Sequence, residues 1–302
     1  MPHHFLSLED LPAEEIPGLL ERGQSIKSQR LVLDNLAGSC LVLMFEKAST
    51  RTRVSFEVAA RELGGYTLFM TPAESQLGRS EPLKDTARVL SRYCRGMVVR
   101  TFAQENLREL ARHADIPVIN ALSDSFHPCQ VLSDLLTMSE RSPDLSEVTV
   151  AWVGDGNNVA QSWINAATKL PITLYLACPE GFEPDRDLLN RALEAGAEIK
   201  MTRDPKLAVS VADYVNTDVW ASMGQEGEEE ERLRRFAPFS ITSDLMAHAP
   251  ESARVMHCLP AHRDQEISEE VLEGPASIVW DQAENRLHMQ KALMEWVFGN
   301  TF

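Results

Sequence analysis

One short segment, residues 49–53, places hydroxyl and guanidinium side chains at the junction of a strand and a helix. Its sequence is Ser-Thr-Arg-Thr-Arg, between the uncharged run Cys40–Phe45 and the helically spaced apolar residues of Val54–Leu63. Free N–H groups and the dipole at a helix start favour an anion there. Arg51 and Arg53 add donors that match phosphate geometry. The segment predicts an oxyanion site, with phosphate favoured over the alternative of an exposed helix cap carrying two solvated arginines.

Two other segments carry groups that could act on a bound substrate. His127-Pro128-Cys129-Gln130 places an imidazole at a helix start, where it could donate to a carbonyl or phosphate oxygen. His257-Cys258-Leu259-Pro260 is followed closely by a second histidine, His262. Zinc would need a fourth ligand, and a nucleophilic cysteine is possible. We rank both below a site in which the thiol and backbone carbonyls orient an amine.

Two further features give weaker signals. The turn Gly154–Val159 resembles a dinucleotide fingerprint but holds valine where the third glycine is required, so a nucleotide-binding oxidoreductase remains an alternative. Its two asparagine amides lie at a strand end and could instead bind a polar ligand. Asp218, near Ser222 and Met223, could hold an ammonium group or simply cap the next turn.

Composition limits the classes of partner. The chain has 302 residues, a net charge of −16 and a pI near 5.0, so nucleic acid and anionic membrane surfaces would repel it. Five widely spaced cysteines indicate reduced thiols rather than a disulfide framework. The first residues lack the pattern of a signal peptide, and no apolar run is long enough for a membrane span. These features predict a cytoplasmic protein without nucleic-acid or membrane partners.

Strand and helix patterns alternate four times before residue 140 and begin again after the turn at 141–144. This predicts an α/β fold of two domains, each a parallel sheet flanked by helices. The expected domains are residues 1–140, with a closing helix at 285–302 packing back on them, and residues 141–284, ending in a strand at Ile278–Trp280. Ligands of such sheets bind at the carboxyl ends of the strands, where Arg100, His127 and Gln130 fall.

Taken together, four motifs resemble the ornithine carbamoyltransferases. These are Ser49-Thr50-Arg51-Thr52, His127-Pro128-Cys129-Gln130, Asp218 through Gln225, and His257-Cys258-Leu259-Pro260. The first two are shared with aspartate carbamoyltransferases, so they indicate only the carbamoyl phosphate half of the site. The other two are similar to the ornithine enzymes specifically. The match runs in register over nearly the whole chain.

The resemblance implies a role for each matched residue, in a site placed in the cleft between the domains. It assigns the phosphate of carbamoyl phosphate to Ser49, Thr50, Arg51 and Thr52, its carbonyl oxygen to Arg100 and His127, and its amide to Gln130. It assigns the α-amino acid part of ornithine to Asn158, Asp218, Ser222 and Met223, although Asn157 could replace Asn158. It places Cys258 and Leu259 beside the δ-amine, and Arg286 completes the pocket.

The implied reaction needs no cofactor and no metal. Carbamoyl phosphate and L-ornithine give L-citrulline and phosphate, as in arginine biosynthesis, with Arg51, Arg100, His127 and Cys258 as the catalytic groups. The resemblance also implies a homotrimer in which Gln76 reaches the neighbouring subunit. Alternatives are a carbamoyltransferase for aspartate, acetylornithine or putrescine, and a two-lobed amino-acid-binding protein without catalytic activity.

Overall fold

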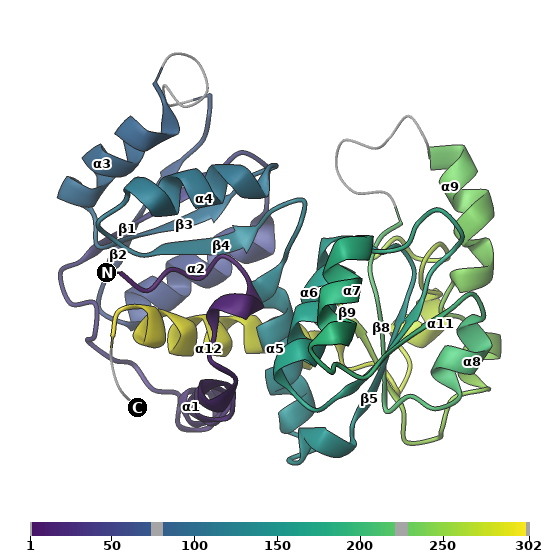
Figure 1. The fold of residues 1–302 in the computed structure, drawn as a ribbon. Helices are drawn as coiled ribbons and strands as arrows, with labels where there is room; N and C mark the ends of the chain where they lie inside the picture. The colour runs from purple at the N-terminus through teal and green to yellow at the C-terminus, as the bar shows by residue number, and fades with distance from the viewer. Residues whose placement is uncertain (1, 74–80, 221–228, 300–302) are drawn as a thin grey trace. The chain divides into compact units, whose positions relative to one another are not determined.

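The structure, a computed structural model, describes residues 2–73, 81–220 and 229–299. The chain folds into two compact units, residues 1–136 with 285–302, and residues 137–284. Each unit contains one parallel sheet covered by helices on both faces (Figure 1). The predicted α/β class with two parallel sheets is therefore confirmed. The unit boundaries fall inside helices α5 (Pro128–Ser139) and α12 (Val279–Val297). The boundary in α5 lies a few residues before the turn at 141–144.

The first unit is built on a sheet with the strand order β2-β1-β3-β4. Its strands are β1 (Cys40–Phe45), β2 (Tyr66–Met70), β3 (Gly96–Arg100) and β4 (Val118–Leu122). Helices α3 (Leu83–Tyr93) and α4 (Gln104–His113) cover one face, and α2 (Thr50–Glu62) lies on the other (Figure 1). All six residues of β1 are buried, as expected for a strand inside a parallel sheet.

Helix α12 continues from the second unit into the first, where its last three turns are tied to α2 and to α1 (Ile16–Gln29). The buried ammonium of Lys291 contacts the Glu62 carboxylate at 2.8 Å. The Arg22 guanidinium donates two hydrogen bonds to Glu295, at 2.7 and 2.9 Å. These contacts join the C-terminal segment to the fold that carries the phosphate motif.

The second unit has the strand order β7-β6-β5-β8-β9, also parallel. Its strands are β5 (Thr149–Val153), β6 (Thr173–Ala177), β7 (Ile199–Thr202), β8 (Tyr214–Thr217) and β9 (Arg254–His257). Figure 1 shows α6 (Asn158–Lys169) and α7 (Arg186–Glu194) on one face and α8 (Pro205–Val209) and α11 (Glu269–Leu272) on the other. The short helices α9 (Glu229–Phe236) and α10 (Ser243–Met246) lie between β8 and β9 in the chain.

The expected strand at Ile278–Trp280 is wrong. Only Ser277 bridges to Val255 of β9, through hydrogen bonds on either side of it, and α12 begins at Val279. Three consecutive apolar residues do not distinguish a strand from the start of a buried helix, and here the helix continues with a 3.6-residue repeat. The closing helix is therefore longer at its N-terminus than the segment 285–302 that the sequence indicated.

None of the helices in the described part of the chain is long and apolar enough to cross a membrane.

Candidate active site

The phosphate motif lies in the first turn of α2 rather than in a loop before it. Ser49 is the N-cap, and its Oγ accepts a hydrogen bond from the Thr52 backbone N–H at 3.3 Å. The helix begins at Thr50, four residues earlier than the apolar spacing alone suggested. Thr50 and Arg51 thus sit where the helix dipole and the first N–H groups favour an anion.

The two arginines of this motif have different surroundings. Arg53 points away along α2, where its Nε donates to Glu57 at 2.8 Å and its guanidinium lies 3.7 Å from the centre of the Phe69 ring. Arg51 is near enough to His127 for its charge to act on the imidazole. Arg53 is thus engaged with other side chains, and a contact of both guanidinium groups with an anion stays a prediction.

Arg286 joins two of the predicted site residues of the first unit. Its Nη2 donates to Thr52 Oγ1 at 2.9 Å, and its Nη1 donates to Gln130 Oε1 at 2.6 Å. Arg286, Thr52 and Gln130 are each no more than 3% exposed. The helix start of α2, the first turns of α5 and the middle of α12 therefore meet around one buried guanidinium.

His127 lies beside three guanidinium groups. Burial lowers the pKa of its imidazole well below 6.5, and the charges of Arg286, Arg100 and Arg51 lower it further. Arg100 ends β3, at a point where the pairing with β4 shifts register by one residue. A neutral imidazole beside several cations can donate a hydrogen bond to an oxygen that becomes negative, without adding a proton to it.

Sequence reasoning missed two contacts around this cluster. Lys47, buried two residues after the end of β1, forms an ion pair with Asp124 at 2.5 Å, and its ammonium lies 4.2 Å from the centre of the Phe102 ring. Asp134, fully buried one turn after Gln130, accepts a hydrogen bond from the Gln130 amide at 2.8 Å. The spacing of four residues between Gln130 and Asp134 was the available signal, since such pairs share one helix face.

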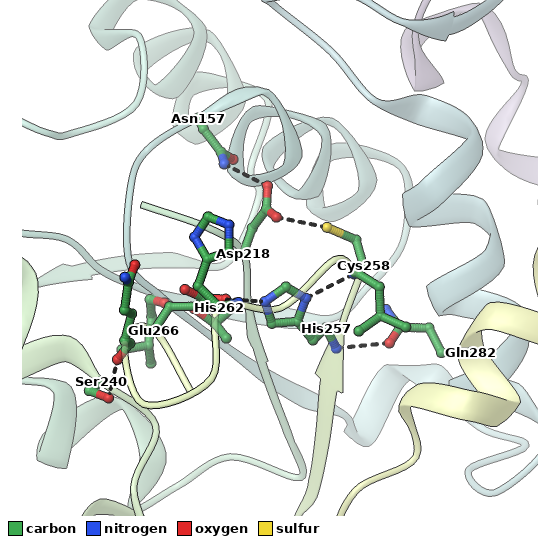
Figure 2. A network of polar contacts seen from close by, with 12 residues as sticks. Asn157, Asp218, Ser240, His257, Cys258, His262, Glu266 and Gln282 are labelled. Atoms are coloured by element: carbon green, nitrogen blue, oxygen red, sulfur yellow. Dashed lines mark hydrogen bonds and ion pairs between the residues drawn. The ribbon is translucent and has the colours of Figure 1, made fainter. Parts of the chain in front are cut away.

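The second unit carries a separate polar cluster centred on Asp218, just after β8 (Figure 2). The two oxygens of its carboxylate have different partners. Oδ1 accepts a hydrogen bond from the Cys258 thiol at 2.9 Å, and Oδ2 accepts one from Asn157 Nδ2 at 2.9 Å. The carboxylate is half-buried, so it offers negative charge in a site partly removed from water.

Asn157 contacts Asp218 in the structure. Asn157 is the N-cap of α6, and its Oδ1 accepts from the N–H groups of Val159 and Ala160, which leaves its amide nitrogen for Asp218. Asn158 is the first residue of α6 and half-buried. The contact of Asn158 with a substrate stays a prediction.

The His257-Cys258-Leu259-Pro260 segment is held by a buried histidine–glutamate pair (Figure 2). His257 Nε2 lies 3.1 Å from Glu266 Oε1, and both side chains are fully buried. His257 Nδ1 accepts the Leu259 N–H at 2.8 Å, so the ring proton is on Nε2 and faces Glu266. The peptide bond between Leu259 and Pro260 is cis, and Leu259 has φ +55°. These contacts fix the backbone that carries Cys258 and Leu259.

Ligand atoms of Asp218, His257 and Cys258 lie within 4.8 Å of one another, close enough to raise the question of a metal. Both ring nitrogens of His257, however, already have partners in Leu259 and Glu266. The remaining thiol and carboxylate contact each other. This arrangement suits an amine next to Asp218 and Cys258 better than a metal ion.

The glycines of the 154–159 turn have a packing role. A Cβ on Gly156 would lie 2.1 Å from the backbone nitrogen of Pro184, and the Gly156 N–H donates to Phe182 at 2.8 Å. Gly156 therefore allows the chain near Phe182 to approach the end of β5 closely. The dinucleotide-like spacing has this explanation without a nucleotide.

Gln76, Ser222 and Met223 lie outside the described residues.

Comparison with known families identifies the half of the chain that carries each cluster. Residues 3–140 match the model of the aspartate/ornithine carbamoyltransferase, carbamoyl-P binding domain, and residues 146–297 match that of the aspartate/ornithine carbamoyltransferase, Asp/Orn binding domain. The chain belongs to the aspartate/ornithine carbamoyltransferase family. Within this family the Ser49–Thr52 motif lies in the half named for carbamoyl phosphate, and the Asp218 cluster lies in the half named for the amino acid.

Relatives in the family match along nearly the whole chain. The ornithine carbamoyltransferase of Nitratidesulfovibrio vulgaris is 62% identical over 298 residues, which cover 99% of each chain. That of Geobacter sulfurreducens is 51% identical, covering 97% of this chain and 98% of the relative. The solved ornithine carbamoyltransferase of Pyrococcus furiosus superposes with a TM-score of 0.94 at 46% identity, covering 100% of this chain and 98% of that one. The solved anabolic ornithine carbamoyltransferase of Campylobacter jejuni superposes with a TM-score of 0.92 at 39% identity, covering 97% of this chain and 98% of that one.

Proposed function

We propose that this carbamoyltransferase-family chain transfers the carbamoyl group of carbamoyl phosphate to the δ-amine of L-ornithine, giving L-citrulline and phosphate. The observation that carries the choice of acceptor is the Asp218 carboxylate, held by Asn157 and Cys258. A cluster rich in hydrogen-bond acceptors favours a substrate with an ammonium or amine group. Aspartate as the substrate would instead need a cation at the same place. The relatives named above carry the same activity in their names.

In the first half of the proposed site, the start of α2 binds the phosphate. Ser49, Thr50, Arg51 and Thr52 supply backbone N–H groups, hydroxyls and one guanidinium. Gln130 contacts the carbamoyl amide, and Arg286 holds Gln130 and Thr52 in place. Arg53, engaged with Glu57 and Phe69, is left out of the proposed phosphate contacts.

The proposed chemistry is a direct attack of the neutral δ-amine on the carbonyl carbon. The carbonyl oxygen becomes negative in the tetrahedral intermediate, and Arg100 and neutral His127 stabilise it, an effect worth about 3–4 kcal/mol for each well-placed donor. The bond to the phosphate oxygen then breaks, and the amine proton passes to the leaving phosphate. No covalent bond to the enzyme forms, so Cys258 acts as a hydrogen-bonding group rather than as a nucleophile.

The amino-acid half of the proposed site surrounds ornithine. Asp218, Asn158, Ser222 and Met223 bind the α-amino acid part, and Cys258 and Leu259 line the approach of the δ-amine. An unperturbed primary amine of this kind has a pKa of about 10.4, so the site must bind the minor neutral form or promote loss of a proton. The contacts of His257 with Glu266 and with the Leu259 N–H hold the backbone of Cys258 and Leu259 in place. This backbone can therefore orient the amine for attack.

We further propose that the enzyme is a cytoplasmic homotrimer that serves arginine biosynthesis. Gln76 of each subunit reaches the site of the neighbouring subunit. The Campylobacter jejuni relative is named an anabolic enzyme, which supports the biosynthetic direction. Light scattering of the purified protein at several concentrations would test the trimer, and Gln76→Ala would test the shared site.

The reaction itself is tested by product stoichiometry. Purified protein is mixed with carbamoyl phosphate and L-ornithine, and citrulline and inorganic phosphate are measured in parallel. The proposal predicts equal amounts of the two products and no citrulline without ornithine. Phosphate release without citrulline would contradict it, because that would show hydrolysis or transfer to another acceptor.

A further inference from the structure

The side-chain amide of Gln130 is held on both sides by buried charged residues. Its Nε2 donates to Asp134 Oδ1 at 2.8 Å, and its Oε1 accepts from Arg286 Nη1 at 2.6 Å. Gln130 is 1% exposed, Asp134 0% and Arg286 3%. Water therefore has little access to this chain of contacts, and the protein groups determine how the amide is turned.

The chemistry of the two neighbours allows only one orientation of that amide. An ionised carboxylate offers acceptors alone, and a guanidinium offers donors alone. Turning the amide by 180° would set its carbonyl oxygen against Asp134 and its NH₂ group against Arg286, so both hydrogen bonds would be lost to like-with-like contacts. The pair of neighbours thus holds the amide carbonyl on the side of Arg286 and Thr52, where the start of α2 lies.

The orientation has a consequence for the substrate. A carbonyl oxygen has two lone pairs, and Arg286 uses one of them. The other lone pair can accept an N–H from an acyl phosphate that carries an amino group on its carbonyl carbon. A methyl group in that position offers no donor, and it would leave a buried acceptor without a partner.

We propose that Asp134 is a positioning residue that turns Gln130 so that the site selects carbamoyl phosphate over acyl phosphates lacking the NH₂ group. The inference rests on the carbamoyl phosphate half of the proposed function. Asp134 acts through Gln130 and touches no substrate itself. Its burial on the same face of α5, one turn after Gln130, is what makes the orientation independent of solvent.

The test uses two stable ligands that differ only at the group in question, phosphonoacetamide with an NH₂ and 2-oxopropylphosphonate with a CH₃. Calorimetry measures the dissociation constant of each, and that of inorganic phosphate, for the wild type and for Asp134→Asn. An asparagine can present either its oxygen or its NH₂ to Gln130, so in this variant the Arg286 contact alone favours the native orientation of the amide. Wild type should prefer the amide ligand by about tenfold, roughly the value of one hydrogen bond.

In Asp134→Asn the preference should fall to about threefold, because only the Arg286 contact still orients the amide, while the dissociation constant of inorganic phosphate stays within about twofold of the wild-type value. Ser133→Ala is the matched control, because Ser133 is equally buried on α5 and its hydroxyl donates to the Cys129 carbonyl instead of to Gln130. This variant should keep the tenfold preference, whatever it does to the melting temperature. If Asp134→Asn does not fold, Asp134→Ser makes the same change with a smaller side chain, since a hydroxyl also donates or accepts.

Three results would overturn the inference: no preference in the wild type, a preserved preference in the Asp134 variants, or equal weakening of all three ligands. Binding requires no turnover, so the result is separate from that of the reaction assay. A protein that shows the preference but makes no citrulline would contradict the proposed acceptor and leave the role of Asp134 standing.

Discussion

The thiol of Cys258 donates a hydrogen bond to the carboxylate of Asp218 at 2.9 Å, although the two residues are 40 positions apart in the chain. Parallel pairing of β8 and β9 brings them together, because each residue directly follows the end of its strand. A carboxylate held in this way by a thiol and by the Asn157 amide has a fixed direction before any substrate binds. This pre-organised acceptor is the basis of the proposed preference for an amine substrate.

Asp218→Ala should raise the KM for ornithine by about 10- to 100-fold, because it removes a charge-assisted hydrogen bond of roughly 1.5–3 kcal/mol. The KM for carbamoyl phosphate should change by less than about threefold, since Asp218 belongs to the second unit and the phosphate motif to the first. Steady-state kinetics with each substrate varied in turn measures both. Equal increases in the two KM values would contradict the division of the site into two halves.

The two arginines of the phosphate motif provide a matched pair. Arg51→Ala should raise the KM for carbamoyl phosphate by about 10- to 100-fold through loss of a guanidinium–phosphate contact. Arg53→Ala removes the same charge two residues away, but Arg53 is exposed and bound to Glu57. Its loss should change that KM by less than about twofold. A large effect of Arg53→Ala would show that its position in the structure is not the one it takes in the enzyme at work.

His127 should make stability depend on pH. Its pKa in the folded protein lies well below 6.5, so between the two values the unfolded chain binds a proton that the folded chain does not. The free energy of unfolding should therefore fall as the pH drops below about 6.5, by up to about 1.4 kcal/mol per pH unit from this group. Urea titrations from pH 7.5 to pH 5 would show the slope. His127→Gln should flatten it, and an unchanged slope would remove His127 as its source.

Gly156 tests the packing of the 154–159 turn, and Gly18 in α1 serves as the comparison. Gly156→Ala places a methyl group 2.1 Å from the Pro184 nitrogen, and it should destabilise the protein by about 2–3 kcal/mol or more. Gly18→Ala, inside α1 with nothing within 4 Å, should instead stabilise it by about 0.5–1 kcal/mol. Urea unfolding of both variants gives the comparison. A mild effect of Gly156→Ala would mean that the two chain segments can move apart.

Much of the fold could be predicted from the sequence because buried parallel strands are uniformly apolar and helices here begin at recognisable caps. Cys40–Phe45 contains no charge, and Ser49 caps α2 as a hydroxyl residue should. The strand predicted at Ile278–Trp280 was wrong, because three apolar residues carry too little periodicity to distinguish a strand from a helix.

The site was harder to predict at the level of single contacts. Sequence alone could not separate Arg51 from Arg53, because which guanidinium faces the anion depends on where α2 begins and on the neighbours Glu57 and Phe69. It could not show that Asn157 caps α6 and contacts Asp218, which depends on where α6 begins. The pairing of His257 with Glu266 is likewise set by the fold of the chain after β9.

Acceptor specificity tests the central claim most directly. Wild-type protein is supplied with carbamoyl phosphate and, in parallel reactions, with L-ornithine, aspartate, acetylornithine or putrescine, and each carbamoylated product is measured. The account predicts rapid product formation with L-ornithine and a value of kcat/KM lower by at least about 100-fold with each of the others, as expected when a charged contact in a partly buried site is lost. Preferred carbamoylation of aspartate, acetylornithine or putrescine would contradict the roles given to Asp218 and Cys258.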